Sequence, residues 1–518
     1  MDFSPRRDGL STAGTDSIVT NARAAVTASS REAAAAGERI LRAGGNAVDA
    51  AVATALASCV ADPCNTGIGG FGGHMIVAAP GRDPACIDFN LWAPRAAAGT
   101  YRSGIALGPG ASVIPNVVAG LAAALEAFGT MRWAEVIAPA IVLADDGFVA
   151  GPTLSRAFAD VADAAFVREC FSIEPAKSGV GLQIRQPALA GTLRQLAADG
   201  PQWFYDGALA ASGGHCLSAG GHPIAPADWA EAMRAVTIAP APSLRFDTVT
   251  AFSSPLGTSG SICMFAVLAA GHALGADANL ESATAIRRVV ERMAAAWSYR
   301  FGTRDGNSIA GDSIAQWIDR AAAFDSSAPI ARGNGHTCHL NTADRNGMLA
   351  ATTLTHGKLW FGARWVLPGT GIIMNCGGPA MCEPEPKIAA GRAYGVTNMC
   401  PTIVRLDDGA ALAIGTPGAR RIASIVGLVL TRHLFGGVPL QDAVAHGRFH
   451  AEDRGCATLE VDRLPPAAGG ALETAFRKVE PERQADYYGP CTAIRRAGDG
   501  TVILGLDDRW PGFGALVA

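Results

Sequence analysis

Thr337 is the residue whose type and neighbours most directly suggest covalent chemistry. It lies in the run Gly335-His336-Thr337-Cys338-His339, about two-thirds of the way along the chain. A threonine hydroxyl inside a chain is a weak nucleophile, because no adjacent group takes its proton. At the start of a chain, the residue's own α-amino group can act as that base, and its pKa of about 7.7–8.0 suits catalysis near neutral pH. We therefore predict that the chain is cut before Thr337, so that cleavage creates the active residue.

The residues beside Thr337 have less direct roles. We expect Cys338 to be a strand residue that faces away from Thr337, rather than a second nucleophile, and His339 to be a structural, hydrogen-bonded histidine. His336 would either assist cleavage or be a bystander, and the sequence leaves both open. A metal site made of His336, Cys338 and His339 is disfavoured, because adjacent strand positions face opposite sides of a sheet. We therefore predict no bound metal.

The glycine-rich segment at residues 67–75 invites comparison with nucleotide-binding loops. Such a dinucleotide loop follows a strand and opens a helix, whereas this segment leads into an apolar strand. The lysine and Ser or Thr of a P-loop are also missing. A tight turn near an active site is the better interpretation, and we predict no cofactor.

A hairpin is predicted to position Thr337. Residues 337–343 alternate as a strand, and residues 348–355 form a suitable partner strand. Asp344-Arg345-Asn346-Gly347 lies between them, and Asn-Gly is a strong hairpin signal because it accepts positive φ angles. Thr337 would therefore begin an edge of a two-stranded unit.

Further elements are predicted around this hairpin. Residues 24–28 are expected to form a short strand, followed by a helix that Ser29 or Ser30 caps. Helices are predicted at residues 31–43, 46–56 and 285–297. The second is rich in alanine, which indicates close packing against a sheet or another helix. Residues 325–334 carry few bulky apolar side chains and are expected to form an exposed, mobile segment before the cut.

Composition limits the class of protein. The chain has 518 residues, of which 49% are hydrophobic and 17% charged, which is typical of a compact enzyme. The net charge of −4 argues against a nucleic-acid-binding surface. Twelve cysteines in a chain of this length do not form a disulfide framework. No apolar run is long enough for a membrane span, and no secretory signal is visible at residues 1–21. We therefore expect a cytoplasmic protein.

Several segments combine into a recognisable pattern. They include Gly44-Gly45-Asn46-Ala47-Val48-Asp49, Gly67-Ile68-Gly69-Gly70, and the segments at residues 88–94, 138–148, 204–207 and 415–422. Together they resemble the γ-glutamyltransferases, also called glutathione hydrolases, from about residue 22 to the end of the chain. The resemblance implies an α+β fold, the four-layer αββα sandwich of N-terminal-nucleophile hydrolases. It also implies a loose tail at residues 1–21, a helix-rich large subunit at 22–336 and a strand-rich small subunit at 337–518, intertwined in one globular unit.

The resemblance assigns catalytic roles to four residues. Thr337 stands where the family has its nucleophile, and Thr355 where the family keeps a threonine that hydrogen-bonds the nucleophile. Residues 415–422 resemble the family's Gly-Ser-Pro-Gly-Gly-Ser-Arg-Ile loop, in which two successive backbone N–H groups hold the oxyanion. Gly418 and Ala419 would supply these N–H groups here. Donors aimed at developing charge make a large contribution to catalysis.

The substrate-binding positions depart from the family. Asn90 replaces an arginine that clamps the substrate carboxylate, Thr397 and Asn398 replace two serines, and Gly357 replaces an asparagine. The stretch at residues 375–379 lacks the family's aspartates, and the nearby Glu383 and Glu385 have no assigned counterparts in the family motif. Without these charges, a γ-glutamyl group would be disfavoured. The residues that could shape a replacement pocket are His356, Lys358, Trp360, Arg364 and Trp365.

These observations predict a self-processing threonine amidohydrolase or acyltransferase. Its two subunits would remain associated and act on a small amide that is not a γ-glutamyl compound. Some relatives of this fold act on β-lactam side chains, oxamate or polyglutamate, and the resemblance allows each. A genuine γ-glutamyltransferase with a rebuilt pocket and a catalytically silent binding homologue are the alternatives. Further dimerisation is left open, and no nucleic acid or membrane partner is expected.

Overall fold

The computed structural model describes most of the chain. The described residues are 10–12, 22–161, 163–176, 179–303, 313–324, 326–328, 335–382, 387–389, 391–482, 487–509 and 512–518. Glu383 and Glu385, whose alignment the sequence leaves open, lie outside these ranges. Within them, no helix combines the length and the apolar character needed to span a bilayer.

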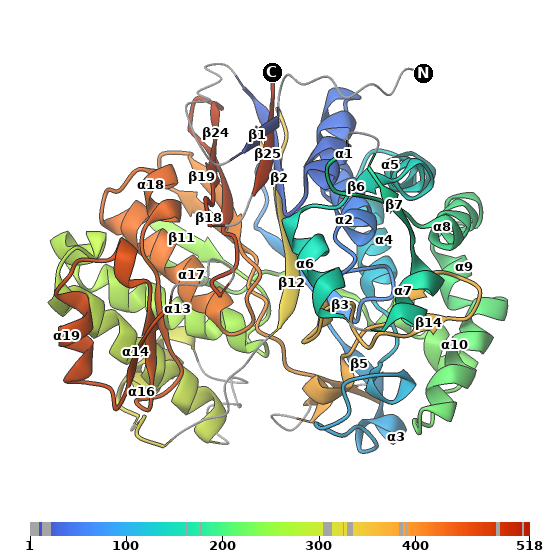
Figure 1. The fold of residues 1–518 in the computed structure, drawn as a ribbon. Helices are drawn as coiled ribbons and strands as arrows, with labels where there is room; N and C mark the ends of the chain where they lie inside the picture. Colours follow the sequence, from blue (N-terminus) through green and yellow to red (C-terminus); the bar gives the residue numbers. More distant parts are fainter. Residues whose placement is uncertain are drawn as a thin grey trace.

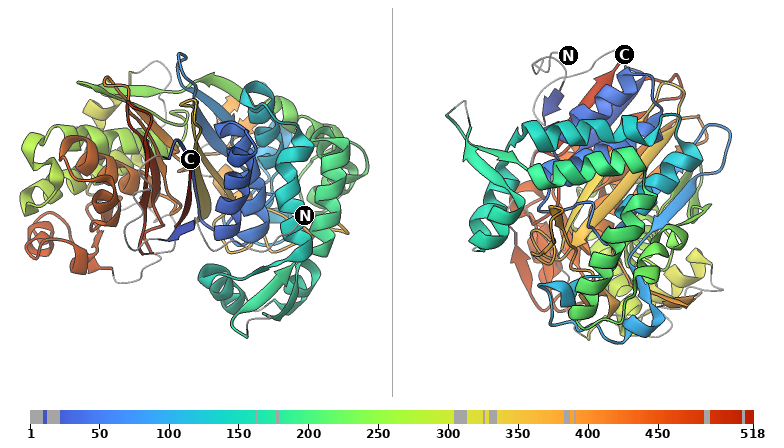
Figure 2. Two further views of the ribbon diagram at one scale, coloured as in Figure 1. Left: turned by 90° about the horizontal axis from the view of Figure 1, so that it is seen from above. Right: turned by 90° about the vertical axis from the view of Figure 1, so that its right-hand side faces the viewer.

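Two large sheets stand face to face at the centre of the molecule (Figures 1 and 2). The eight-stranded sheet has the order β1 (Leu10–Thr12), β25 (Phe513–Val517), β2 (Ala24–Ala28), β12 (His336–Ala343), β13 (Leu349–Gly357), β3 (Gly72–Ala78), β4 (Ala85–Phe89) and β9 (Thr237–Pro240). The six-stranded sheet has the order β10 (Ser243–Phe246), β11 (Val249–Phe252), β18 (Thr402–Leu406), β19 (Ala411–Gly415), β23 (Thr492–Arg496) and β24 (Val502–Leu506). Neighbouring strands in both sheets are antiparallel, which suits two facing sheets with buried inner faces.

Helices cover the outer face of each sheet (Figure 1). On the larger sheet lie α1 (Arg31–Arg42), α2 (Ala47–Ala61) and α4 (Val117–Phe128), backed by α5 (Trp133–Asp146) and α8 (Pro187–Asp199). On the smaller sheet lie α13 (Ser259–His272) and α17 (Arg421–Leu430), with α14 (Ala283–Gly302) and α16 (Ile314–Ala322) packed behind them. The order helix, sheet, sheet, helix is the predicted four-layer αββα sandwich, so the predicted fold class is confirmed.

Shorter elements decorate this sandwich. Three small sheets are β16 (Lys387–Ala389), β17 (Arg392–Tyr394) and β5 (Trp92–Pro94); β20 (Phe449–Ala451), β21 (Ala457–Leu459) and β22 (Val479–Pro481); and β6 (Phe148–Val149), β8 (Leu182–Arg185) and β7 (Ser172–Pro175). The pair β14 (Val366–Leu367) and β15 (Ile372–Ile373) completes them. The helix α6 (Pro152–Asp160) follows β6, and its first residues line the same cavity as Thr337.

Three apolar cores hold the layers together. One fills the space between the larger sheet and its helices, and a second does the same on the other side. A third, smaller cluster, which includes Ile76, Ile403 and Ile494, lies between the sheets. The alanine-rich α2 is buried along its whole length, which explains why it extends beyond the predicted end at residue 56. Its small side chains allow the close approach to β12 and β13.

The local predictions near the N-terminus and the hairpin are confirmed. Ser30 caps α1 by accepting a hydrogen bond from the N–H of Ala33 at 3.2 Å. In the hairpin turn, the N–H of Asp344 donates to the carbonyl of Met348 at 3.0 Å, and Gly347 has a φ of +94°. The side chain of Asp344 also accepts from the N–H groups of Asn346 and Met348. This turn fixes the register of β12 against β13.

Three expectations are corrected. Part of the predicted tail, Leu10–Thr12, forms the strand β1. It pairs with β25, the last strand of the chain, along an edge of β25 that would otherwise be unpaired. β12 is an interior strand rather than an edge, although β2 pairs only with its far part, Asn341–Ala343. Of the segment at residues 325–334 that is expected to be exposed, the structure describes only 326–328. Residues 327 and 328 are exposed as expected, whereas Ser326 is buried and accepts a hydrogen bond from the side chain of Arg454 at 3.2 Å. The other positions of this segment lie outside the described residues.

Both sheets combine strands from before and after position 337. The larger sheet takes β2 and β3 from the first part of the chain and β12, β13 and β25 from the second. The smaller sheet places β11, from the first part, beside β18 from the second. A cut before Thr337 would therefore leave two fragments joined by shared sheets and cores.

Candidate active site

Thr337 lies near the start of β12, at an irregularity in the pairing with β13. His336 pairs with Gly357 and Cys338 pairs with Leu354, so one residue of β12 faces two residues of β13. Such a β-bulge redirects side chains and is frequent beside active sites. Thr337 is 6% exposed and borders two cavities.

The two cavities differ in size. The larger has a volume of about 700 Å³ and extends past α6, Ser29, Asp62 and Tyr487. The smaller has a volume of about 170 Å³ and extends past Thr355, Gly357 and Thr397. Thr337, His336, Gly335 and Lys358 line both cavities. A substrate amide at Thr337 would therefore have one cavity available for its acyl part and another for its amine.

A hydrogen-bonded chain runs from Gly357 to the bond before Thr337. The N–H of Gly357 donates to the hydroxyl oxygen of Thr355 at 2.8 Å. The Thr355 hydroxyl in turn donates to the carbonyl oxygen of His336 at 2.5 Å. Hydrogen bonds in series polarise one another, so the carbonyl of the His336–Thr337 peptide is polarised toward attack. In this uncut chain, Thr355 bonds to that carbonyl and not to the Thr337 hydroxyl.

The predicted oxyanion turn follows β19 and leads into α17. Gly418 has a φ of +131° and Ala419 a φ of +55°. Residues other than glycine rarely adopt positive φ angles. Gly418 lines the larger cavity and Ala419 the smaller, so the turn lies between them. Among the described residues, neither N–H group donates to another protein group. Two unused N–H groups near Thr337, at the positive end of a helix, suit the binding of an oxyanion.

The segment behind the turn is held in close contact. A Cβ atom added to Gly489 would lie 2.0 Å from the carbonyl oxygen of Pro417, so only glycine fits there. The carbonyl of Gly489 accepts a hydrogen bond from the buried guanidinium of Arg448 at 2.7 Å. Arg448 thus fixes the backbone on which the turn rests.

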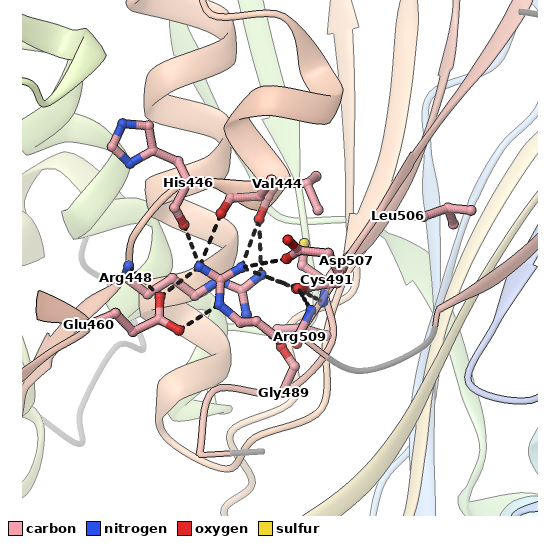
Figure 3. Close-up of polar contacts among 12 residues, drawn as sticks. Val444, His446, Arg448, Glu460, Gly489, Cys491, Leu506, Asp507 and Arg509 are labelled. Carbon is pink, nitrogen blue, oxygen red and sulfur yellow. Dashed lines mark hydrogen bonds and ion pairs between the residues drawn. The ribbon is translucent and has the colours of Figure 1, made fainter. Parts of the chain in front are cut away.

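Arg448 belongs to a buried ionic cluster (Figure 3). It pairs with Asp507, whose neighbour Arg509 binds Glu460 through two nitrogens, each at 2.6 Å. Two arginines and two carboxylates balance in charge. Burial alone would raise the pKa of Asp507, but Arg448 and Arg509 hold it below its usual value. Removing one member of such a cluster would leave an uncompensated buried charge, at a cost of about 3–5 kcal/mol.

The residues beside Thr337 point in different directions. The Sγ atom of Cys338 lies 3.3 Å from the hydroxyl of Ser29, and burial raises the pKa of this thiol to about 12. His339 bonds Thr353 at 2.8 Å and Asn341 at 3.0 Å, as expected of a structural histidine. Cys338 and His339 thus have separate partners, and the disfavoured metal site that would join them to His336 is not formed. Among the residues that the structure describes, no group of three or more His, Cys, Asp or Glu side chains is suited to a metal ion.

His336 stacks on Trp360 with ring centroids 3.7 Å apart. Burial, followed by the positive charges of Arg421, Arg156 and Arg364, lowers the pKa of His336 to about 4. The imidazole is therefore neutral at physiological pH. The structure leaves both expected roles for it, assistance in cleavage or none.

A buried carboxyl in the larger cavity was not predicted from the sequence. Asp62 is 6% exposed and accepts hydrogen bonds from the Ser29 hydroxyl and the Asn65 amide, both at 2.8 Å. Burial raises its pKa to about 6, although these hydrogen bonds act in the opposite direction. Asp62 ends α2, and a carboxyl after an apolar helix is too common in sequences to mark a site.

Comparisons with known proteins agree with this geometry. The family model described as gamma-glutamyltranspeptidase matches residues 33–517. The chain belongs to the gamma-glutamyltranspeptidase family. Its members are N-terminal-nucleophile amidohydrolases and acyltransferases, and the chain is an enzyme of this type.

The relatives have diverse names. The chain is 29% identical over 500 residues to the "Glutathione hydrolase proenzyme" of Pseudomonas sp. (strain A14), covering 85% of this chain and 83% of that protein. It is 30% identical over 513 residues to the "Oxamate amidohydrolase proenzyme" of Klebsiella pneumoniae, covering 90% of this chain and 93% of that protein. The fold is similar to the crystal structure of cephalosporin acylase from Bacillus halodurans, with a TM-score of 0.80 and 21% identity, covering 100% and 98% of the two chains. This chain is thus a divergent family member.

The substrate-binding residues expected from the family divide into two groups. Gly357, Thr397 and Asn398 line the smaller cavity with Thr337. Asn90 is 8% exposed and donates from its amide to the carbonyl of Gly395 at 3.0 Å, so it supports the segment that leads to Thr397. It does not line either cavity.

His356 also lies away from both cavities. Its ring packs against Gly67, where an added Cβ would lie 2.6 Å from the imidazole, and burial lowers its pKa to about 3. Of the other pocket candidates, Lys358 lines both cavities and Trp360 lines the larger. Arg364 donates to the carbonyl of Trp360 at 3.3 Å, and Trp365 donates to Ser112 at 2.7 Å. Neither of these two lines a cavity.

Two arginines after the oxyanion turn were not recognised as site residues from the sequence. Arg420 lines the smaller cavity, and Arg421 lines the larger one, where it lies 4.4 Å from the centre of the Tyr487 ring. The family loop has Ser-Arg where this chain has Arg420-Arg421, so the substitution at position 420 was the available signal.

Proposed function

We propose that the chain is a self-processing threonine amidohydrolase, with Thr337 as the nucleophile, that acts on a small amide other than a γ-glutamyl compound. The observation that carries this proposal is the position of Thr337 between two cavities, next to a polarised peptide carbonyl and two unused N–H groups. The names of two relatives, both given as proenzymes, support the processing step.

Self-cleavage would follow from the hydrogen bonds around His336. The Thr337 oxygen attacks the carbonyl carbon of His336, and the Thr355 hydroxyl stabilises the negative oxygen that develops. The carbon–nitrogen bond then breaks, and the nitrogen takes a proton to become the α-amino group of Thr337. Water hydrolyses the ester that links His336 to the threonine oxygen. The products are a carboxylate at His336 and a free N-terminal Thr337.

Turnover would use the same centre with an external amide. The new α-amino group takes the hydroxyl proton of Thr337, and the oxygen attacks the substrate carbonyl. Gly418 and Ala419 donate their N–H groups to the oxyanion, the amine leaves with a proton, and water or an acceptor amine releases the acyl group. Removing one such donor costs about 100- to 1000-fold in rate in enzymes of this kind.

The proposed exclusion of γ-glutamyl substrates rests on charge. The family's clamp position is Asn90, whose amide is already bonded to Gly395. Among the described residues that line the smaller cavity, none is an aspartate or glutamate that would pair with a substrate ammonium. A buried charge without a partner is costly, so a zwitterionic acyl group would bind poorly. The cytoplasmic location expected from the sequence stays a prediction.

Intact mass spectrometry of purified wild-type protein and the Thr337→Ala variant tests the nucleophile. We expect two masses for the wild type, with the smaller fragment starting at Thr337, and one mass for the variant. A single uncut chain in both samples would refute the proposal and favour a catalytically silent homologue. If the processed enzyme hydrolysed glutathione faster than short-chain monoamides, a γ-glutamyltransferase with a rebuilt pocket would be the better assignment.

A further inference from the structure

A row of buried polar side chains joins the two large sheets close to the nucleophile in sequence. His339 and Asn341, both on β12, are buried and reach strands of the smaller sheet. The third apolar cluster also lies between the sheets, so this row is a polar connection inside a largely apolar interface. A buried polar network whose members are all hydrogen-bonded rigidifies the parts that it joins.

Asn341 links β12 to β2 and β23. Its amide nitrogen donates to the carbonyl oxygen of Thr492 at 3.0 Å and to the hydroxyl of Thr27 at 3.1 Å. Because the nitrogen is used in this way, the amide oxygen faces His339 and accepts from its Nε2–H at 3.0 Å. The Thr353 hydroxyl donates to the other ring nitrogen, Nδ1, at 2.8 Å. Burial lowers the pKa of His339 to about 4, so the ring is neutral and both of its nitrogens are in use.

The row meets the smaller sheet where the oxyanion turn begins. Gly415 ends β19, directly before the turn, and a Cβ atom added to it would lie 2.2 Å from the His339 ring. Only glycine leaves room for the ring there. Thr492 pairs with Gly415 across β23 and β19, and it follows shortly after Gly489, which packs behind the turn. The strand that leads into the turn and the segment behind it are thus both tied to β12.

Self-cleavage and turnover would depend on this link to different degrees. The Thr355 hydroxyl, which would polarise the bond that is cut, comes from β13 in the same sheet as Thr337. The N–H groups of Gly418 and Ala419, which would hold the oxyanion during turnover, follow β19 of the other sheet. The distance between Thr337 and these two N–H groups therefore depends on how the sheets are held together.

We propose that His339 and Asn341 are positioning residues that set the distance between Thr337 and the oxyanion turn. Neither residue lines a cavity, so they would act through β19 and the backbone of Thr492. Their loss should slow the acylation of Thr337 and leave self-cleavage unchanged. This proposal rests on the proposed function, and it gives the row a role beyond holding β12 in the core.

The test compares self-cleavage with acylation in Asn341→Ala. The probe is p-nitrophenyl acetate, a small uncharged acyl donor whose reaction with Thr337 also forms an oxyanion. Cleavage is followed by intact mass, and acetylation of Thr337 by acid quenching and peptide mapping. We expect cleavage at the wild-type rate and acetylation slower by about 100-fold, the order of magnitude for a misplacement of about 1 Å. If Asn341→Ala does not fold, Asn341→Ser replaces it and should slow acetylation by a smaller factor.

Thr342→Val is the matched control. Thr342 is fully buried on the same strand, and its hydroxyl donates to the carbonyl of Ala47 at 2.6 Å, on the helix side of the sheet. The variant loses a buried hydrogen bond that does not reach the smaller sheet, so it should be less stable in chemical denaturation but acetylate at the wild-type rate. Gly415→Ala disturbs the row from the other strand, because the added methyl group pushes β19 away from His339. It should slow acetylation as Asn341→Ala does.

The possible outcomes separate this proposal from the proposed function. Acetylation of Asn341→Ala at the wild-type rate, or equally slow acetylation of Thr342→Val, would overturn the positioning role and leave the nucleophile in place. A wild-type chain that is cut but not acetylated at Thr337 would overturn the role of the oxyanion turn, and this inference with it. A wild-type chain that stays uncut would refute the proposed function itself.

Discussion

Replacing Thr355 by valine should slow self-cleavage while leaving the fold intact. Valine has nearly the same shape as threonine but has no hydroxyl. The substitution removes the 2.5 Å hydrogen bond to the His336 carbonyl and leaves the N–H of Gly357 without its acceptor. Because β-branched residues are favoured in strands, β13 should still form.

The expected magnitude follows from the role of this bond. The Thr355 hydroxyl donates to the oxygen that becomes negative when Thr337 attacks, so its loss resembles the loss of an oxyanion-hole donor. Such a loss costs about 100- to 1000-fold in rate, or about 3–4 kcal/mol. The stability cost should be smaller, at about 1–3 kcal/mol for a buried donor left unsatisfied.

The assay is a time course of cleavage after cell-free synthesis, with both fragments quantified by intact mass. Thr352→Val is the matched control on the same strand, because Thr352 is fully buried and its hydroxyl has no hydrogen-bond partner among the described residues. It should cleave at the wild-type rate and be equally stable or more stable. Wild-type cleavage by Thr355→Val would refute the assignment of Thr355 as the group that polarises the bond.

Substitutions at three other positions test separate parts of the site. Ala419 has a φ of +55°, so Ala419→Val should destabilise the fold by about 1–3 kcal/mol in chemical denaturation, whereas Ala419→Gly should cost less than 1 kcal/mol and still be processed. Cys338→Ala should cleave normally by intact mass, because the thiol is buried and its pKa is raised to about 12. Asp62 has a native pKa of about 6, above its ordinary value of 3.8, so its stabilising contribution of about 3 kcal/mol is present below pH 4 and is lost as pH rises through 6. Asp62→Asn should remove this slope from stability measured between pH 4 and 7, and an unchanged slope would contradict it.

Local elements were predictable because their signals lie within a few residues. The turn at Asp344–Gly347 combines a side chain that accepts two backbone N–H groups with a glycine at positive φ, and both are visible in the sequence. The pairing of β2 with β12 has no such signal, because Thr27 and Asn341 meet across more than 300 residues. The four-layer arrangement was therefore predicted through the family resemblance and not through periodicity.

The position of His356 could have been predicted better. Thr355 and His356 were both expected at the site, but successive strand residues face opposite sides of a sheet. If β13 alternates regularly here and Thr355 reaches the bond before Thr337, then Gly357 shares its side and His356 faces the opposite side. The structure places the His356 ring against Gly67 in that direction. The alternation of side chains along β13 therefore favours Thr355 over His356 as the residue that faces the site.

Position 90 has lost the family's arginine and position 420 has gained one. These two changes show why the substrate specificity was harder to predict than the type of reaction. At position 90, asparagine now supports the Gly395 carbonyl, which lies two residues before Thr397 in the cavity wall. At position 420, an arginine enters the same wall from the oxyanion turn. The sequence shows one loss and one gain 330 positions apart, and only the fold shows that Arg420 lines the smaller cavity whereas Asn90 lines neither cavity. The loss at position 90 could be recognised from the sequence because the family motif on both sides of it is recognisable, whereas the place of Arg420 in the cavity wall depends on how the turn after β19 lies against β12 and β13.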